Sequence, residues 1–261
     1  KKISLEIFQI FSPINKFDNH LIQTDIINKI KNSNAEYIIF AENNYPNLIS
    51  DINSIDILKH IKDNKKVIIG TTRIDKNKFY NSFLFLEKDN VQIFDKKILV
   101  PFGEFLPFRS YLKFLESISG NVDFTRGNKE RIIKSSDQVN ILPVICYEII
   151  FKKILRKINQ KEIDILINIT NDSWFGNTIG PYQHFYHARM RALISNKYLL
   201  RVSNNGISAI IDNNGKVLKF TKLNTINSIN YLLEIKNTMY FSTIHNIFIF
   251  YLIFIIFINF I

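Results

Sequence analysis

A thiol, a carboxylate and an ammonium group stand directly after apolar runs in this sequence and have the chemistry of a covalent catalytic site. Cys146 follows ILPVI, Glu42 follows YIIFA, and Lys96 comes soon after VQIF. A thiol with an ordinary pKa of about 8.5 becomes a nucleophile when a base takes its proton or a cation stabilises the thiolate. Singly, Cys146 would be read as a buried apolar residue and the two charges as solvated loop residues. Together, they predict nucleophilic catalysis.

The residues around Cys146 predict a sharp turn from a strand into a helix. The apolar run before Cys146 is followed by Tyr147, Glu148 and a further apolar stretch, which we interpret as a helix over residues 148–157. Such a turn resembles a nucleophile elbow, because the unpaired N–H groups at a helix N-terminus favour a thiolate and the oxyanion of a tetrahedral intermediate.

The hydrophobic periodicity predicts the elements that must position these side chains. Strands alternate with helices over about 220 residues, so we expect a single α/β domain over residues 1–236, with polar ligand-binding residues at strand ends. The expected strands are 2–10, 36–41, 67–72, 79–86, 91–94, 139–146, 164–168, 198–202, 207–211 and 216–220, and the expected helices are 21–31, 52–62, 148–157 and 182–195.

The C-terminal residues 237–261 differ from the rest because they carry no charged side chain, and residues 247–258 are unbroken apolar and aromatic. A bilayer core of about 30 Å is crossed by ~20 helical residues. We therefore predict a transmembrane helix over 237–261. A buried β-hairpin or core helix is the alternative, since Ile and Phe also suit strands.

Composition restricts the partners and cofactors. The formal net charge is +11, yet 26 of the 34 basic residues are Lys in a chain rich in Ile and Asn, which is typical of a genome that favours A and T codons. No basic helix or base-stacking module accompanies this charge, so we predict no nucleic-acid partner. A single cysteine excludes an internal disulfide and a Cys-rich metal site. The chain has no GxxxxGK[ST] loop for a nucleotide.

Four stretches carry a family resemblance: AENNYP, KKILVPFGEFLPF, ICYE, and NDSWFGNTIGPYQHFYHARMRALISNKYLLRVSNNGISAIID. In order and spacing they resemble the nitrilase-like domain of the bacterial apolipoprotein N-acyltransferase family, within the carbon-nitrogen hydrolase superfamily. The resemblance implies a nitrilase-like α-β-β-α sandwich followed by a transmembrane helix. It also implies a monomer without a cofactor at the bacterial inner membrane, with the catalytic domain on the periplasmic side.

The resemblance further implies a Glu-Lys-Cys triad. Glu42 would be the general base, Lys96 would hold the oxyanion together with the Tyr147 N–H, and Cys146 would be the nucleophile. The donor would be a phospholipid, whose acyl chain would form a thioester with Cys146. The acceptor would be the α-amine of the lipid-modified N-terminal cysteine of an apolipoprotein.

Other residues are implied to surround the triad. Glu104 and Glu148 would orient Lys96 and line the pocket, although ordinary loop or helix-start acids are the plainer interpretation. Phe102 and Phe105 belong to an apolar arm that would touch acyl chains or the bilayer, or else pack under another loop. Trp174 would shape the site, with core packing as the alternative.

Histidines 184 and 187 lie three residues apart on a predicted helix and could present two metal ligands. No third ligand is apparent in the sequence, so we predict no metal site.

Two other functions compete with acyl transfer. A soluble nitrilase-like amidase would use the same triad with water as the second acceptor. It would need neither the apolar tail nor the LVPFGEFLPF arm. A membrane-anchored binding protein that has lost activity is the other rival, and the intact set of Glu42, Lys96 and Cys146 argues against it.

Overall fold

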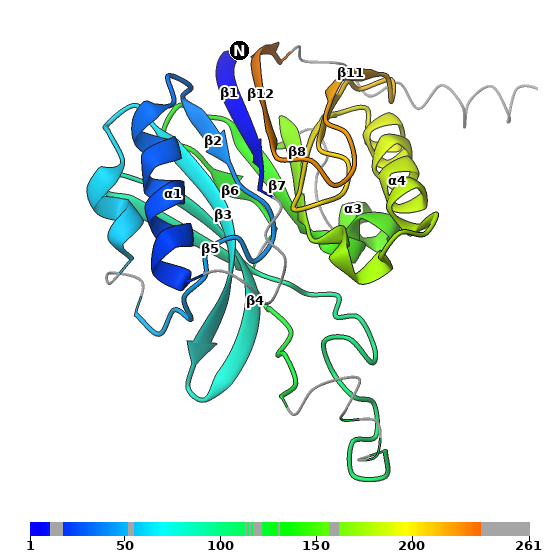
Figure 1. The fold of residues 1–261 in the computed structure, drawn as a ribbon. Helices are drawn as coiled ribbons and strands as arrows, with labels where there is room; N and C mark the ends of the chain where they lie inside the picture. The colour runs from blue at the N-terminus through cyan, green and yellow to red at the C-terminus, as the bar shows by residue number, and fades with distance from the viewer. Residues whose placement is uncertain are drawn as a thin grey trace, which may run out of the picture.

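The computed structural model of the chain describes residues 1–10, 18–51, 55–112, 114, 116, 122–129, 131–156 and 162–235. Its described part contains two six-stranded sheets that lie face to face (Figure 1). The strand order is β12-β1-β2-β3-β4-β5 in the first sheet and β11-β10-β9-β8-β7-β6 in the second. In each sheet, parallel strands at the centre are flanked by antiparallel strands.

The strands of the first sheet are β1 (Lys2–Gln9), β2 (Tyr37–Ile39), β3 (Lys66–Asp75), β4 (Lys78–Glu87), β5 (Asn90–Asp95) and β12 (Asn227–Glu234). Those of the second sheet are β6 (Ile133–Lys134), β7 (Asn140–Ile145), β8 (Ile165–Thr170), β9 (Tyr198–Ser203), β10 (Ala209–Ile211) and β11 (Val217–Phe220). The α-helices are α1 (Asn19–Asn32), α3 (Lys153–Arg156) and α4 (Gly180–Ser195), and the 3-10 helices are η2 (Asp56–His60), η4 (Cys146–Ile150) and η6 (Asp172–Phe175).

Three apolar clusters divide the molecule into layers. The central cluster joins the inner faces of the two sheets, with Leu5 of β1 and Ile167 of β8 among its members. A second cluster places Ile26 and Ile30 of α1 on the outer face of the first sheet, and a third places Ala188 of α4 on the outer face of the second. The predicted α-β-β-α sandwich is therefore confirmed. Burial of such side chains stabilises the fold by roughly 1.5–3 kcal/mol for each large one.

Two predicted helices are shorter in the structure. Of the helix predicted at 148–157, residues 148–150 end η4 and residues 153–156 form α3, while residue 157 lies outside the described part. The turn after β7 therefore begins with a single 3-10 turn. The helix predicted at 52–62 is the 3-10 helix η2, and residues 52–54 lie outside the described part.

The sequence interpretation missed strand β12, whose pattern of exposed and buried residues fits an edge strand. It pairs antiparallel with β1 along its whole length, from Lys2 opposite Glu234 to Gln9 opposite Asn227. The first and last strands of the described chain therefore lie side by side (Figure 1).

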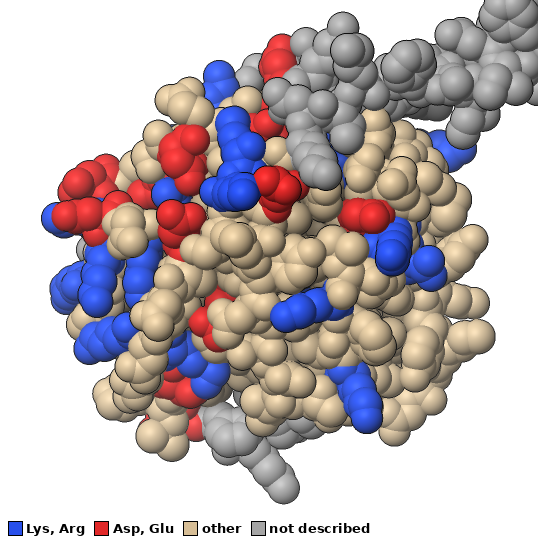
Figure 2. All heavy atoms as spheres, turned by 90° about the horizontal axis from the view of Figure 1, so that it is seen from above, with Lys and Arg blue, Asp and Glu red and all other residues tan. Residues whose placement is uncertain are grey.

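The surface carries mixed charge on the face seen in Figure 2. Basic and acidic side chains alternate over the half that includes α1, whereas the half that includes α4 has few charges. Within the described residues, no helix is long and apolar enough to cross a membrane. The transmembrane helix predicted at 237–261 lies outside that part of the chain and stays a prediction.

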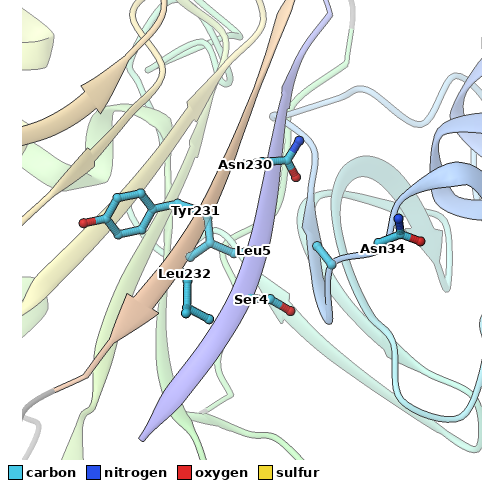
Figure 3. Close-up of a pocket in the computed structure, with 7 residues that line it drawn as sticks. Ser4, Leu5, Asn34, Asn230, Tyr231 and Leu232 are labelled. Carbon is cyan, nitrogen blue, oxygen red and sulfur yellow. The ribbon is translucent and has the colours of Figure 1, made fainter.

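A hollow of about 350 Å³ lies beside β1 and β12, at one edge of the first sheet (Figure 3). Its lining includes Ser4, Asn34 and Asn230, and none of the predicted site residues belongs to it.

Candidate active site

The three residues with catalytic chemistry meet although they belong to different sheets. Glu42 follows β2 and Lys96 follows β5 in the first sheet, whereas Cys146 follows β7 in the second. Lys96 Nζ lies 3.6 Å from Glu42 Oε1. The charges of Glu42 and Lys96 both act on the Cys146 thiol, Glu42 raising its pKa and Lys96 lowering it. The strand ends of the two sheets thus bring the carboxylate, the ammonium group and the thiol to one place.

The Glu42 carboxylate is fixed by hydrogen bonds to both of its oxygens. Asn81 Nδ2 donates to Oε1 at 2.7 Å, and the backbone N–H of Asn171 donates to Oε2 at 2.7 Å. Gly70 of β3 makes room for this segment, because a Cβ atom there would lie 2.5 Å from the Glu42 Cα. The carboxylate is 4 % exposed, so its orientation is set by the protein and not by solvent.

Lys96 is 1 % exposed and shares its charge between two carboxylates. Its Nζ donates to Glu104 Oε1 at 2.7 Å, a shorter contact than the one with Glu42. Asn81 Nδ2 donates to the same Glu104 oxygen at 2.9 Å, and the backbone N–H of Val100 donates to Glu104 Oε2 at 2.9 Å. Glu104 therefore contacts Lys96 directly, and its role in orienting Lys96 for catalysis stays a prediction.

The site keeps Cys146 as a protonated thiol, which needs a base before it can act as a nucleophile. Burial, followed by the nearby Glu42 charge, raises the pKa of the Cys146 thiol to about 12, although Lys96 opposes this shift. Burial also raises the pKa of Glu42, and Lys96 limits the rise. Burial by itself would lower the pKa of Lys96, but Glu42, Cys146 and Glu104 outweigh it and keep the amine protonated. A carboxylate with a raised pKa is a stronger base for the thiol proton.

Cys146 has a backbone φ of 49°, in the left-handed region that residues with a Cβ atom rarely adopt. Such strain costs of order 1–3 kcal/mol and clusters at functional sites. The chain turns here from β7 directly into η4. The predicted sharp turn is present, and it places the partly buried Cys146 beside the exposed Tyr147.

Glu148 is fully buried and contacts the backbone on both sides of the site rather than the Lys96 ammonium group. Its Oε1 accepts from the N–H groups of Lys97 and Ile98 at 2.9 and 3.0 Å, and its Oε2 accepts from that of Ile145 at 3.0 Å. Arg131 donates to both oxygens at 2.7 and 2.8 Å. Glu148 thus ties the segment after Lys96 to the turn that carries the thiol.

The aromatic residues predicted to surround the site are largely exposed. Phe102 has a positive φ of 64° and is 47 % exposed, and Trp174 is 75 % exposed. Phe105 is partly buried, and its carbonyl accepts from the Phe102 N–H at 2.8 Å. The Arg126 guanidinium lies 5.8 Å from the Phe105 ring. These exposures show that Trp174 is not a core residue, and they leave its role as a prediction.

The two histidines do not face a common point. His184 is buried and contacts Asp172, whereas His187 is exposed. Among the described residues, no group of three His, Cys, Asp or Glu side chains could hold a metal ion.

Several buried polar residues of the site escaped sequence reasoning: Asn81, Arg131, Asn168, Asp172 and Arg201. Each lies in or next to a segment of mostly buried residues, as Asn81 does in FYNSFLFL. For Asn81, Asn168 and Arg201, the available signal was a polar residue within an otherwise apolar strand, because such a buried group needs a partner.

Comparisons with known proteins place this fold in a family. The model of the carbon-nitrogen hydrolase family matches residues 24–229, so the chain belongs to this family. A carbon-nitrogen hydrolase superfamily protein from Xanthomonas campestris superposes with a TM-score of 0.66 at 14% identity, covering 90% of this chain and 91% of that one. A nitrilase-superfamily protein from Saccharomyces cerevisiae gives 0.67 at 18% identity, covering 90% of each.

More similar relatives carry the name apolipoprotein N-acyltransferase. The protein of Rickettsia typhi is 40% identical over 194 residues, which are 74% of this chain and 38% of that protein. The protein of Wigglesworthia glossinidia brevipalpis is 41% identical over 217 residues, 77% of this chain and 43% of that protein. The chain therefore spans about two fifths of the length of these relatives.

Proposed function

We propose that this chain carries the catalytic domain of an apolipoprotein N-acyltransferase. The observation that carries the proposal is the buried pair of Glu42 and Lys96, 3.6 Å apart, whose charges both act on the Cys146 thiol within the carbon-nitrogen hydrolase fold. The identity of about 40% with proteins named apolipoprotein N-acyltransferase supports the choice of reaction. The substrates follow from that likeness and from the residues of the apolar arm.

The first half-reaction transfers an acyl chain to sulfur. Glu42 takes the Cys146 proton, and the sulfur attacks the ester carbonyl of a phospholipid. Lys96 and the Tyr147 N–H stabilise the oxyanion that forms. The ester C–O bond breaks, the lysophospholipid leaves as an alcohol with the proton held by Glu42, and a thioester remains on Cys146.

The second half-reaction transfers the chain from sulfur to nitrogen. The free α-amine of a lipid-modified N-terminal cysteine attacks the thioester carbonyl, which is more electrophilic than that of an ester. Glu42 accepts the amine proton as the C–S bond breaks, and this proton returns to the sulfur. An amide and a free thiol result, with no cofactor consumed.

The location follows from the same proposal. The substrates are lipids, so the domain would act at the periplasmic side of the bacterial inner membrane, held there by a helix over 237–261. The exposed Phe102, Phe108 and Tyr111 support contact with acyl chains, because exposed aromatic groups of this size favour a lipid boundary over water.

An acceptor assay tests the proposal. The full 261-residue chain in detergent receives a phospholipid with a labelled acyl chain and a synthetic diacylglyceryl-cysteine peptide with a free α-amine. We expect a labelled amide on the peptide and none on a matched peptide whose amine is acetylated. Release of labelled free fatty acid at the same rate with or without the peptide would contradict acyl transfer, because it indicates that water is the acceptor.

A further inference from the structure

Four buried residues form a second polar group on the carbonyl side of Cys146, which we name the support cluster. They are Asn168 of β8, Asp172 of η6, His184 of α4 and Arg201 of β9, and each is at most 2 % exposed. The proposed chemistry assigns them no role. Burial of this many polar groups is costly unless all are hydrogen-bonded, so their arrangement calls for an explanation.

Arg201 is the centre of this cluster. Its Nη1 donates to Asn168 Oδ1 at 2.6 Å, and its Nη2 donates to Asp172 Oδ2 at 2.8 Å. The other Asp172 oxygen lies 2.8 Å from His184 Nδ1. Arg201 thereby fixes the position of Asn168 directly and that of His184 through Asp172.

Both branches end on the same atom, the carbonyl oxygen of Cys146. Asn168 Nδ2 lies 3.4 Å from this oxygen and also donates to the Val144 carbonyl at 3.1 Å. His184 Nε2 lies 3.3 Å from it. His184 thus contacts Asp172 with one ring nitrogen and the Cys146 carbonyl with the other.

The Cys146 carbonyl belongs to the same rigid peptide unit as the Tyr147 N–H. The peptide bond is planar and trans, so its C=O and N–H point in opposite directions. Donors that hold the carbonyl on one side therefore direct the N–H to the other. This matters at Cys146, because a φ of 49° is not a conformation that the residue keeps without support.

We propose that the support cluster is a positioning device that fixes the Cys146–Tyr147 peptide plane, so that the Tyr147 N–H points at the oxyanion. This inference rests on the proposed role of Cys146 as an acyl carrier. His184 and Asn168 are positioning residues in it, because neither needs to touch the acyl group. A misdirected N–H would slow a reaction through an oxyanion while leaving the thiol itself reactive.

Two reactions of the Cys146 sulfur distinguish a misdirected Tyr147 N–H from a change in the reactivity of the thiol. Acylation by p-nitrophenyl acetate passes through a tetrahedral oxyanion, and alkylation by iodoacetamide does not. Both are measured on the full chain with intact mass as the readout for Cys146, and neither requires a phospholipid or a lipoprotein. Failure of the proposed lipid substrates would therefore leave this test unaffected.

A matched pair of variants at His184 gives the sharpest result. His184→Gln keeps a donor that can reach the Cys146 carbonyl, whereas His184→Asn keeps only the shorter reach toward Asp172. We expect His184→Asn to slow acylation about 10- to 100-fold, below the 10²–10³ known for complete loss of an oxyanion donor. Alkylation should stay within about twofold, and His184→Gln should recover most of the acylation rate.

Arg191 supplies the structural control, because this buried residue of α4 binds the same turn further along. Its Nε and Nη2 donate to the carbonyls of Ile149 and Ile150, at 2.9 Å each, and not to that of Cys146. We expect Arg191→Lys to lower the melting temperature with little change in the ratio of acylation to alkylation. Equal slowing of both reactions in His184→Asn, or the same ratio in the Gln and Asn variants, would overturn the inference.

Discussion

The buried carboxylates around Cys146 fall into two groups that the protein treats differently. Glu42, in front of the thiol, has a raised pKa and shares one ammonium group with Glu104. Glu148 and Asp172 each have their own guanidinium partner, and their pKa values are lowered because Arg131 and Arg201 outweigh the opposing effect of burial. Glu42 can therefore gain and lose a proton, whereas Glu148 and Asp172 stay ionised.

The comparison shows that the cationic partner of a buried carboxylate decides whether it can act as a base or only stabilises the structure. A guanidinium that binds a carboxylate closely leaves that carboxylate unable to act as a base near neutral pH. An ammonium group 3.6 Å from Glu42 stabilises charge without removing basicity. The proposed proton acceptor and the structural carboxylates thus differ in their cationic partners and not in their own residue type.

Loss of the proton acceptor gives the largest expected effect. We expect Glu42→Gln to slow acyl transfer by roughly 10²–10⁴, the contribution of a general base. Alkylation of Cys146 at pH 8 should become faster, because the Glu42 charge raises the pKa of the thiol and its removal lowers it. Iodoacetamide labelling of both proteins measures the second effect. Unchanged or slower labelling in the variant would contradict a Glu42 charge that raises the pKa of the thiol.

Lys96→Met tests the opposite charge in the same group. Lys96 lowers the pKa of the Cys146 thiol, so its loss should raise that pKa and slow alkylation, the reverse of the Glu42 result. Acyl transfer should fall about 10²–10³, as for loss of an oxyanion stabiliser. The cysteine pH profile of each variant provides the measurement. Shifts of the same sign in both variants would contradict the assigned charges.

Glu148→Gln breaks the second group, and its main expected effect is on stability. Removing one partner of a buried ion pair costs about 3–5 kcal/mol, here because Arg131 would be left uncompensated. The pKa of Glu148 is lowered on folding, so its contribution is present above the ordinary glutamate range and is lost as pH falls below it.

Denaturant unfolding of Glu148→Gln at several pH values checks both statements. The gap between wild type and variant should be widest at neutral pH and should narrow in acid. Lys59→Gln is a suitable control, because its ion pair with Asp56 is exposed and should contribute little. A gap that is independent of pH would contradict a Glu148 that is ionised in the folded protein.

The smallest effect on stability is expected for exposed aromatic residues that belong to neither group of carboxylates. Phe108 and Tyr111 are 77 % and 83 % exposed, so serine at either position should change the free energy of unfolding by less than about 0.5 kcal/mol. Acylation by p-nitrophenyl acetate should be unchanged, and transfer from phospholipid vesicles should fall severalfold. Equal rates with vesicles would remove the arm from lipid recognition.

The sequence predicts the part of the site that depends on residue type and strand order. Glu42, Lys96 and Cys146 stand after strands, and the alternation of strands and helices predicts that such residues lie at sheet edges. The partners that fix them could not be predicted in the same way. Asn81 reaches Glu42 from β4, two strands away from β2 in the same sheet, and Arg131 reaches Glu148 across seventeen residues. These contacts depend on register and packing that no local pattern encodes.

Helix lengths show the same limit. The apolar stretch after Cys146 favours a helix by local pattern, but Arg191 binds the carbonyls of Ile149 and Ile150 in η4 and holds it as a short turn. Tertiary hydrogen bonds override local preference there. Strand β12 was missed because its identity depends on pairing with β1, at the opposite end of the described chain.

Trapping of the acylated protein tests the central assignment most directly. The full chain is incubated with a phospholipid that carries a labelled acyl chain, without an acceptor, and its intact mass is measured before and after hydroxylamine. The account predicts a mass increase of one acyl chain on Cys146, removed by hydroxylamine and absent in Cys146→Ala. An acyl adduct of equal yield in Cys146→Ala, or a wild-type chain that releases product without ever carrying the label, would contradict it.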